Sequence, residues 1–393
     1  MVGLSVRQVQ RLCGRVRREG PAGIAHRLRG RPSNNQLDAD KLERALSALH
    51  DSLWEGFGPV FARDKLKSMC GIDLSKETLR QLMTQVGLWQ PWGRRLRHRS
   101  WRKRSDCLGM MIQLDGSTHR WFEDRGPMCV LLVYIDDATS RILHAEFVNV
   151  EDTITLLKST RGYLKQWGRP IAFYVDRDSI YKTNRKPTVE EQAQERFPMT
   201  QFTRAMAELG IKVIAANSPQ AKGRVERGFH THQDRLVKEL RLRGISDIES
   251  ANQFLRDGYI EEHNQRYAVV PASSVDAHRQ LVPGQDLMEV LSVLTERTVR
   301  NDYTIQHYRE IFQIQSKAAV HPKAKVVVQE RLDGSMRMLY RGLRLEFKRL
   351  KMLSDETIEP RQTDRKKRRP SVKRLFRYPG YRPPQSRPHI FHQ

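Results

Sequence analysis

Between residues 107 and 268, short apolar runs alternate with longer stretches in which apolar residues recur every three or four positions. The runs are typical of buried strands, and the stretches are typical of helices that cover a sheet. We expect strands at 110–114, 128–136, 141–148, 171–175 and 211–215, and helices at 152–167, 201–209, 220–242 and 247–266. Residues 137–140 predict a hairpin turn. This order predicts a mixed five-stranded sheet with flanking helices.

A further helix is predicted for residues 6–18, with Ser5 as its N-cap. Its apolar positions recur at helical spacing and should pack: Val6, Val9, Cys13 and Val16. Its polar and basic positions could meet DNA: Arg7, Gln8, Arg11, Arg15 and Arg18. A recognition helix of a helix-turn-helix needs two such faces, but an ordinary amphipathic surface helix fits as well. Because only four residues precede Ser5, residues 1–36 are interpreted as a basic helix-turn-helix remnant.

Residues 37–89 read as a second helical segment, with helices expected at 40–53, 59–69 and 74–86. The last two are separated at Gly71 and restart at Ser75, which predicts a helix-turn-helix with Lys76 and Arg80 as its exposed basic positions. A plain three-helix core is the alternative. We therefore treat this segment as a candidate second DNA-binding domain.

Alternating apolar residues return between 290 and 352, and Asp333 with Gly334 marks a hairpin turn. This pattern predicts a small β-barrel at the C-terminal side of the core. The tail, residues 361–393, is rich in arginine, lysine and proline and should be disordered when free.

The net charge of +25 lies almost entirely in three segments. Residues 1–36 carry 8 basic and 1 acidic side chain, residues 90–105 carry 7 and none, and residues 361–393 carry 11 and 1. In the second segment tryptophans alternate with basic residues that include Arg94 and Arg95, so 90–106 is predicted to be a basic linker along a phosphate backbone. This distribution indicates double-stranded DNA as the partner.

The four cysteines have neither CxxC spacing nor a matching histidine pattern, which argues against a zinc site or a disulfide framework. No apolar run approaches the roughly 18 residues of a membrane span, and the N-terminus lacks the apolar core of a signal peptide. We expect a cytoplasmic protein that makes no membrane contact and stays with nucleic acid.

Three acidic residues are the candidates for chemistry. Asp115 and Asp176 each follow an apolar strand at its carboxyl end, and Glu226 lies at the edge of the apolar stripe of a long helix. Neighbouring carboxylates repel one another, and a metal ion usually relieves that repulsion. Asp178 is the rival of Asp176, but Asp176 ends the apolar run directly.

Other acidic and histidine residues have simpler interpretations. Asp136 and Asp137 are most simply residues of the hairpin turn. Three histidines could suggest zinc: His119, His230 and His232. The last two do not face one another on a helix, so DNA contact or solvent exposure is the better interpretation.

The run from Asn217 to Arg227, with Leu114 to Ser117 and Val175-Asp176, resembles the integrase catalytic core of bacterial insertion-sequence transposases. These are DDE enzymes of the retroviral-integrase superfamily, and the resemblance to ISNCY-type transposases extends over most of the chain. It implies a multidomain α/β protein whose ribonuclease-H-like core spans 107–268. It also implies that Asp115, Asp176 and Glu226 are catalytic and bind two Mg²⁺ ions, which Mn²⁺ can replace.

Further residues near Glu226 are expected to meet DNA: Lys222, Arg224, His230 and Gln233. Many such transposases have lysine or arginine where this chain has Gln233, and many have a shorter interval between the second aspartate and the glutamate. Residues 182–198 account for the longer interval here and are interpreted as a surface insertion.

The resemblance predicts binding to insertion-sequence ends, metal-dependent 3′-end cleavage and strand transfer into target DNA, by at least a homodimer on DNA. One alternative is a catalytically impaired, transposase-derived DNA-binding protein, which the short N-terminus favours. Another is a ribonuclease-H-like nuclease without transposition, which the two candidate DNA-binding segments disfavour.

Overall fold

The computed structural model describes residues 4–25, 37–91, 103–183, 185, 187, 192, 198–216, 223–316 and 320–352, with the backbone alone for 223–227, 230, 351 and 352. The chain forms two compact units. The first contains residues 1–296 and 327–339, and the second contains residues 297–326 and 340–393.

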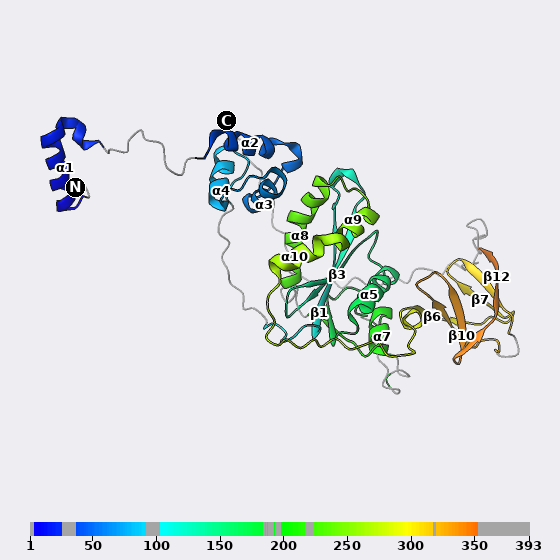
Figure 1. The fold of residues 1–393 in the computed structure, drawn as a ribbon. Helices are drawn as coiled ribbons and strands as arrows, with labels where there is room; N and C mark the ends of the chain where they lie inside the picture. The colour runs from blue at the N-terminus through cyan, green and yellow to red at the C-terminus, as the bar shows by residue number, and fades with distance from the viewer. Residues whose placement is uncertain are drawn as a thin grey trace, which may run out of the picture. The chain divides into compact units, whose positions relative to one another are not determined.

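The first unit contains a five-stranded sheet (Figure 1). In spatial order its strands are β3 (Ile142–Val148), β2 (Cys129–Asp136), β1 (Met111–His119), β4 (Ala172–Val175) and β5 (Lys212–Ala215). β1, β2 and β3 pair antiparallel, whereas β4 pairs parallel with β1 and β5. The mixed five-stranded sheet predicted from the sequence is therefore confirmed. β1 is longer than expected, because residues 116–119 continue to pair with β2.

Helices cover both faces of the sheet. They are α5 (Thr153–Trp167) and α7 (Gln201–Glu208) on one face, and α8 (Gly223–Leu242), α9 (Ile248–Phe254) and α10 (Ile260–Tyr267) on the other. Alternate strand residues enter the two cores: Ile112 and Leu114 lie in the first core, and Leu131 and Val133 lie in the second. The single helix expected at 247–266 is interrupted by a π-helical turn, Leu255–Tyr259, in which Gly258 leaves helical backbone angles.

Residues 4–25 form α1 (Val6–Glu19) and the short 3₁₀ helix η1 (Gly20–Ile24). Ser5 is the N-cap as predicted, and its backbone N–H donates in return to the Gln8 side chain. The apolar stripe was expected to pack, and this expectation is wrong for the described residues: Val6 is 75 % exposed and no residue of α1 is buried. One helix and one turn are too small to cover the stripe.

Residues 37–91 form a separate hydrophobic core around Leu66 and Leu79. Its helices are α2 (Ala39–His50), η2 (Ser52–Trp54), α3 (Pro59–Cys70) and α4 (Lys76–Gln85). The break between α3 and α4 is as predicted, because Gly71 takes the left-handed backbone conformation after α3 and Ser75 caps α4.

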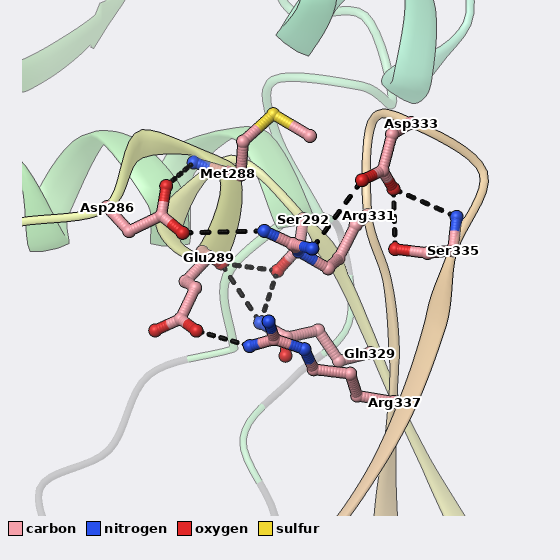
Figure 2. Close-up of polar contacts among 9 residues, drawn as sticks. All are labelled: Asp286, Met288, Glu289, Ser292, Gln329, Arg331, Asp333, Ser335 and Arg337. Atoms are coloured by element: carbon pink, nitrogen blue, oxygen red, sulfur yellow. Dashed lines mark hydrogen bonds and ion pairs between the residues drawn. The ribbon is translucent and has the colours of Figure 1, made fainter.

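Short elements follow residues 107–268, and most of their residues belong to the first unit. They are α11 (Leu287–Val290), β6 (Val293–Thr298), and the antiparallel hairpin of β9 (Lys325–Glu330) and β10 (Met336–Tyr340). Figure 2 shows how ion pairs hold this hairpin against the α11 segment: Arg331 contacts Asp286 at 3.4 Å, and Arg337 contacts Glu289. The predicted turn is present, with Gly334 at a φ of 81°.

The second unit contains a three-stranded antiparallel sheet in the order β12-β8-β7. Its strands are β7 (Thr304–His307), β8 (Glu310–Ile314) and β12 (Phe347–Met352), and β11 (Leu343–Leu345) precedes β12. Strands are thus present where the sequence predicts them, while their closure into a small barrel stays a prediction.

Several predicted features lie outside the described residues: most of the basic linker and of the 182–198 insertion, the segment 217–222, and the tail 361–393. Within the described part of the chain, no helix combines the length and apolar character that crossing a membrane requires.

Candidate active site

The pairing of β1 with β4 brings Asp115 and Asp176 to the same level of the sheet. Met111 pairs with Ala172 and Gln113 with Tyr174, and the same offset of 61 residues relates Asp115 to Asp176, which directly follows β4. Parallel neighbours are roughly 4.8 Å apart across the hydrogen bonds. Both aspartates are half-buried, so their charged groups share one edge of the sheet.

Asp115 belongs to the face of the sheet that α8 covers. Ile112 and Leu114 lie in the core on the opposite side, and side chains alternate along a strand. Two residues beyond Asp115, Ser117 accepts a hydrogen bond of 3.2 Å from Gln233 of α8. This contact ties α8 to the strand that carries Asp115.

The loop after β4 uses Asp176 and Asp178 differently. The backbone N–H of Asp178 donates to Oδ1 of Asp176 at 2.8 Å. The carboxylate of Asp178 accepts the N–H of Ile180 at 3.0 Å, and the side chain is exposed. Asp178 therefore organises the turn, whereas Asp176 lies at the sheet edge.

Glu226 lies in α8, two turns before Gln233, and its side chain is outside the described set. Among the described residues, no three His, Cys, Asp or Glu side chains are grouped closely enough to hold a metal ion. Asp115 and Asp176 provide oxygen donors of the kind that hard divalent cations prefer. Glu226 as a third donor stays a prediction.

Glu151 is a carboxylate that the sequence analysis did not identify. It precedes Asp152, the N-cap of α5, and its carboxylate lies against Gly116: a Cβ at that position would be 2.1 Å from Oε2 of Glu151. Two consecutive acidic residues before a helix were the available signal, because only one of them is needed as the cap. We call Asp115, Glu151 and Asp176 the edge carboxylates.

The electrostatics of this edge suit a cation. Burial raises the pKa of Glu151, a hydrogen bond from Tyr181 lowers it, and the negative charges of Asp115, Asp176 and Asp178 raise it again, with a net increase. A cation between such groups would relieve their repulsion. The oxygen donors of Asp115 and Asp176 and the negative charge at this edge are compatible with a divalent metal.

Asp136 and Asp137, which we call the turn carboxylates, have internal partners. Asp136 accepts hydrogen bonds from the N–H of Gly109 and from Thr139. Asp137 accepts from the N–H and hydroxyl of Ser105 and from Gln113. Their place at the turn is as predicted, and their role is to fasten the segment that enters β1.

The predicted histidines do not form a metal site among the described side chains. His232 is buried, and its Nδ1 is 3.0 Å from the Tyr259 hydroxyl. Burial lowers the pKa of His232 to about 3, with a contribution from His263, so this imidazole is neutral. His119 is half-buried and packs edge-on against Trp121.

The candidate DNA-binding residues of the two helical segments are accessible to different degrees. On α1, Arg7, Arg11 and Arg18 are exposed and Arg15 is half-buried. On α4, Lys76 is exposed, but Arg80 forms an ion pair of 2.5 Å with Glu77. That pairing lowers the pKa of Glu77 to about 2.

The remaining candidates divide into two groups. Arg94, Arg95 and Lys222 lie outside the described residues, as do the side chains of Arg224 and His230. Gln8 and Gln233 are described, and both already make internal hydrogen bonds, with Ser5 and Ser117. Their contact with DNA stays a prediction.

No protein-family model matches the chain. The "Putative transposase y4bF" of Sinorhizobium fredii is 38% identical over 351 residues, which cover 88% of this chain and 75% of that protein. The transposase for insertion sequence IS1202 of Streptococcus pneumoniae is 26% identical over 428 residues, which cover 98% of this chain and 88% of that protein.

Solved structures give fainter likenesses. A simian T-cell lymphotropic virus intasome in complex with PP2A regulatory subunit B56 gamma has a TM-score of 0.35 and 12% identity, covering 74% of this chain and 98% of that chain. The HTLV-2 integrase catalytic core domain in complex with magnesium (trimeric form) has a TM-score of 0.29 and 15% identity, covering 38% and 84%. The two transposases are therefore the informative relatives.

Proposed function

Because the chain belongs to the family of bacterial transposases that includes y4bF and the IS1202 protein, we propose that it binds the ends of an insertion sequence, cleaves them at 3′ ends and transfers them into target DNA. The observation that carries this proposal is the register of β1 and β4, whose offset of 61 residues is also the offset between Asp115 and Asp176. The edge lies on the face that α8 covers, and α8 contains Glu226.

Asp115, Asp176 and Glu226 would hold two Mg²⁺ ions, with Mn²⁺ as a substitute. When bound, such a pair supplies an activated attacking oxygen and charge stabilisation of the leaving oxygen. Asp115 is on β1 and Asp176 directly follows β4, so two paired strands position both aspartates. The Gln233–Ser117 hydrogen bond would fix the register of α8 against the same strand.

The reaction needs no energy-rich co-substrate. In the first step a water attacks a phosphodiester at the element end, and the bond to the 3′-oxygen breaks to release a 3′-hydroxyl. In the second step that hydroxyl attacks a phosphodiester of the target, so one P–O bond forms as another breaks. Since only the nucleophile differs, one set of carboxylates can serve both steps.

The helical segments 1–36 and 37–89 would bind the element ends, while 107–268 performs the chemistry and 290–352 provides a small β-barrel. Basic side chains should contact phosphates and fix the protein on the duplex. In the helical segments and the linker these are Arg7, Arg11, Arg15, Arg18, Lys76, Arg80, Arg94 and Arg95. Near Glu226 in the sequence they are Lys222, Arg224 and His230. Gln8 and Gln233 would supply amide contacts from α1 and α8. Since two ends must be joined, the protein should act as at least a dimer on DNA.

The test compares wild-type protein with Asp176→Asn and with the matched control Asp178→Asn. The substrates are DNA duplexes with the terminal repeats that flank the gene, and products are separated on sequencing gels with Mg²⁺ or Mn²⁺. Asp176→Asn should lower both steps by about a thousandfold or more, since several kcal/mol of transition-state stabilisation would be lost. Asp178→Asn should remain close to wild type, because asparagine can still accept the Ile180 N–H.

Undiminished activity in Asp176→Asn would overturn the assignment. If the wild type binds the ends but gives neither product, the DNA-binding alternative without catalysis is correct.

A further inference from the structure

Glu151 lies where the loop before α5 meets the edge of the sheet. Its Oε2 would be 2.1 Å from a Cβ added to Gly116, and its Oε1 would be 3.1 Å from the same atom. The whole carboxylate thus rests on the backbone directly after Asp115. Only a residue without a side chain leaves room for it there.

Tyr181 fixes this carboxylate from the other side. Its hydroxyl donates to Oε1 of Glu151 at 3.2 Å. The ring is 5 % exposed and packs edge-on against Phe202 at 5.3 Å, while its backbone carbonyl accepts a hydrogen bond from Thr203. Because Tyr181 follows Asp176 in the same loop, Glu151 is connected to both strands that carry the catalytic aspartates.

Local structure does not require an acid at position 151. The N–H groups at the start of α5 are capped by Asp152, which accepts from Thr155 at 2.7 Å. The negative charges of Asp115, Asp176 and Asp178 instead raise the pKa of Glu151. Acidic groups that shift one another's pKa in this way are typical of functional sites.

We propose that Glu151 is a positioning residue of the metal site, a fourth carboxylate that holds the water shell of the cations bound by Asp115 and Asp176. This inference rests on the proposed function. The described carboxylates do not group closely enough to be three direct ligands, so Glu151 acts through water. Mg²⁺ in proteins usually keeps several waters, and carboxylates around the ligands orient them.

The first experiment measures Mn²⁺ binding to the full-length protein by electron paramagnetic resonance, without DNA or turnover. Glu151→Gln keeps the shape of the side chain and should weaken Mn²⁺ binding about tenfold or more, the usual effect of losing an outer carboxylate. Glu146→Gln is the matched control, because Glu146 is also half-buried but faces His144 at 3.7 Å. It should bind Mn²⁺ like the wild type. The Mn²⁺ affinity of Tyr181→Phe should lie between those of Glu151→Gln and Glu146→Gln.

The second experiment measures thermal unfolding of the same variants with and without Mn²⁺. Without metal, Glu151→Gln should melt at a higher temperature than the wild type, because one repelling charge is gone. Saturating Mn²⁺ should raise the melting temperature of the wild type more than that of Glu151→Gln. The difference between the two melting temperatures should therefore narrow or reverse. A merely structural glutamate would give a lower melting temperature in both conditions.

Mn²⁺ binding to Asp176→Asn distinguishes an error in the role of Glu151 from an error in the proposed metal site. If Asp176→Asn weakens Mn²⁺ binding but Glu151→Gln binds like Glu146→Gln, the inference about Glu151 is wrong and the proposed function stands. If neither Asp176→Asn nor Glu151→Gln changes Mn²⁺ binding, the proposed metal site itself is wrong.

Discussion

The turn carboxylates and the edge carboxylates belong to the same sheet but have opposite surroundings. Asp136 and Asp137 accept hydrogen bonds from backbone and side-chain donors at the start of β1. The negative charges of Asp115 and Asp176 act on Glu151, toward the other end of the parallel pairing. The turn carboxylates have hydrogen-bond donors as partners, whereas the groups that act on Glu151 include three carboxylates.

This difference separates a structural acid from a functional one. Burial raises the pKa of Asp136, and the donors Thr139 and Gly109 offset part of the increase. For Glu151, Tyr181 is a side-chain donor, and three neighbouring carboxylates add to the effect of burial, whereas for Asp136 the neighbouring carboxylate that does so is Asp137. Donors inside the fold stabilise a buried carboxylate permanently, whereas a cluster of carboxylates becomes favourable only when a cation binds.

The largest effects should come from the same change, aspartate to asparagine, made in each group. Asp115→Asn should lower DNA cleavage by about a thousandfold or more, through lost transition-state stabilisation. Asp137→Asn should lower the free energy of unfolding by roughly 1–3 kcal/mol, because an NH₂ group would face donors that now have an acceptor. Gel assays of cleavage and urea unfolding of both variants measure the two effects.

The comparison is contradicted if each variant shows the combination of cleavage and stability that is expected of the other. A strongly destabilised Asp115→Asn, or a stable Asp137→Asn without cleavage activity, would show that the assignments of the two groups are reversed.

Hydrophobic periodicity was sufficient to predict the order of strands and helices along the chain and a mixed sheet, but not the spatial order of the strands. It did not predict that β1 continues to His119, because Gly116, Ser117 and Thr118 lack the apolar character of a strand and are held by pairing with β2. It also predicted a packed stripe on α1, although Val6 and Val9 are exposed. Periodicity identifies faces that can pack, but burial depends on distant residues.

The candidate site was predictable only in part for a similar reason. Asp115 and Asp176 stand out because each follows an apolar run, and the 61-residue register between β1 and β4 aligns them. Glu151 follows a polar loop, and its proximity to Gly116 arises from tertiary packing. Gln233 has helical spacing relative to Glu226, but its bond to Ser117 depends on how α8 crosses the sheet.

A smaller effect, on the free energy of unfolding, should come from lowering the pH. It should arise from two buried histidines and not from either group of carboxylates. Burial lowers the pKa of His232 to about 3 and of His263 to about 4, and their rings are 4.6 Å apart. His263 also faces Arg235 and Arg266, which disfavour its protonation. Unfolded histidine takes up a proton near pH 6.5, so stability is full above that pH and falls as pH decreases toward the folded values.

Urea unfolding between pH 7.5 and 4.5 measures this loss, which can reach about 1.4 kcal/mol per pH unit for each histidine. The double variant His232→Gln/His263→Gln should show a flatter dependence, while the exposed His321→Gln should follow the wild type. A slope that persists in the double variant would assign the acid sensitivity to the carboxylates instead.

The smallest effect on the metal site should come from alanine at the glycine beside each group. At Gly109, φ is 75° and a Cβ would be 2.4 Å from Nδ1 of His278, whose ring is held by Tyr163 and Asp276 at 2.6 Å each. Gly109→Ala should therefore destabilise the fold by roughly 1–3 kcal/mol without weakening Mn²⁺ binding to the folded protein.

At Gly116 the new methyl group would meet only the end of the Glu151 side chain, which can move away. Gly116→Ala should thus change the unfolding free energy less than Gly109→Ala but weaken Mn²⁺ binding several-fold, in the direction of Glu151→Gln. Unchanged Mn²⁺ binding in Gly116→Ala, together with wild-type stability, would show that the close contact between Gly116 and Glu151 has no part in positioning the carboxylate.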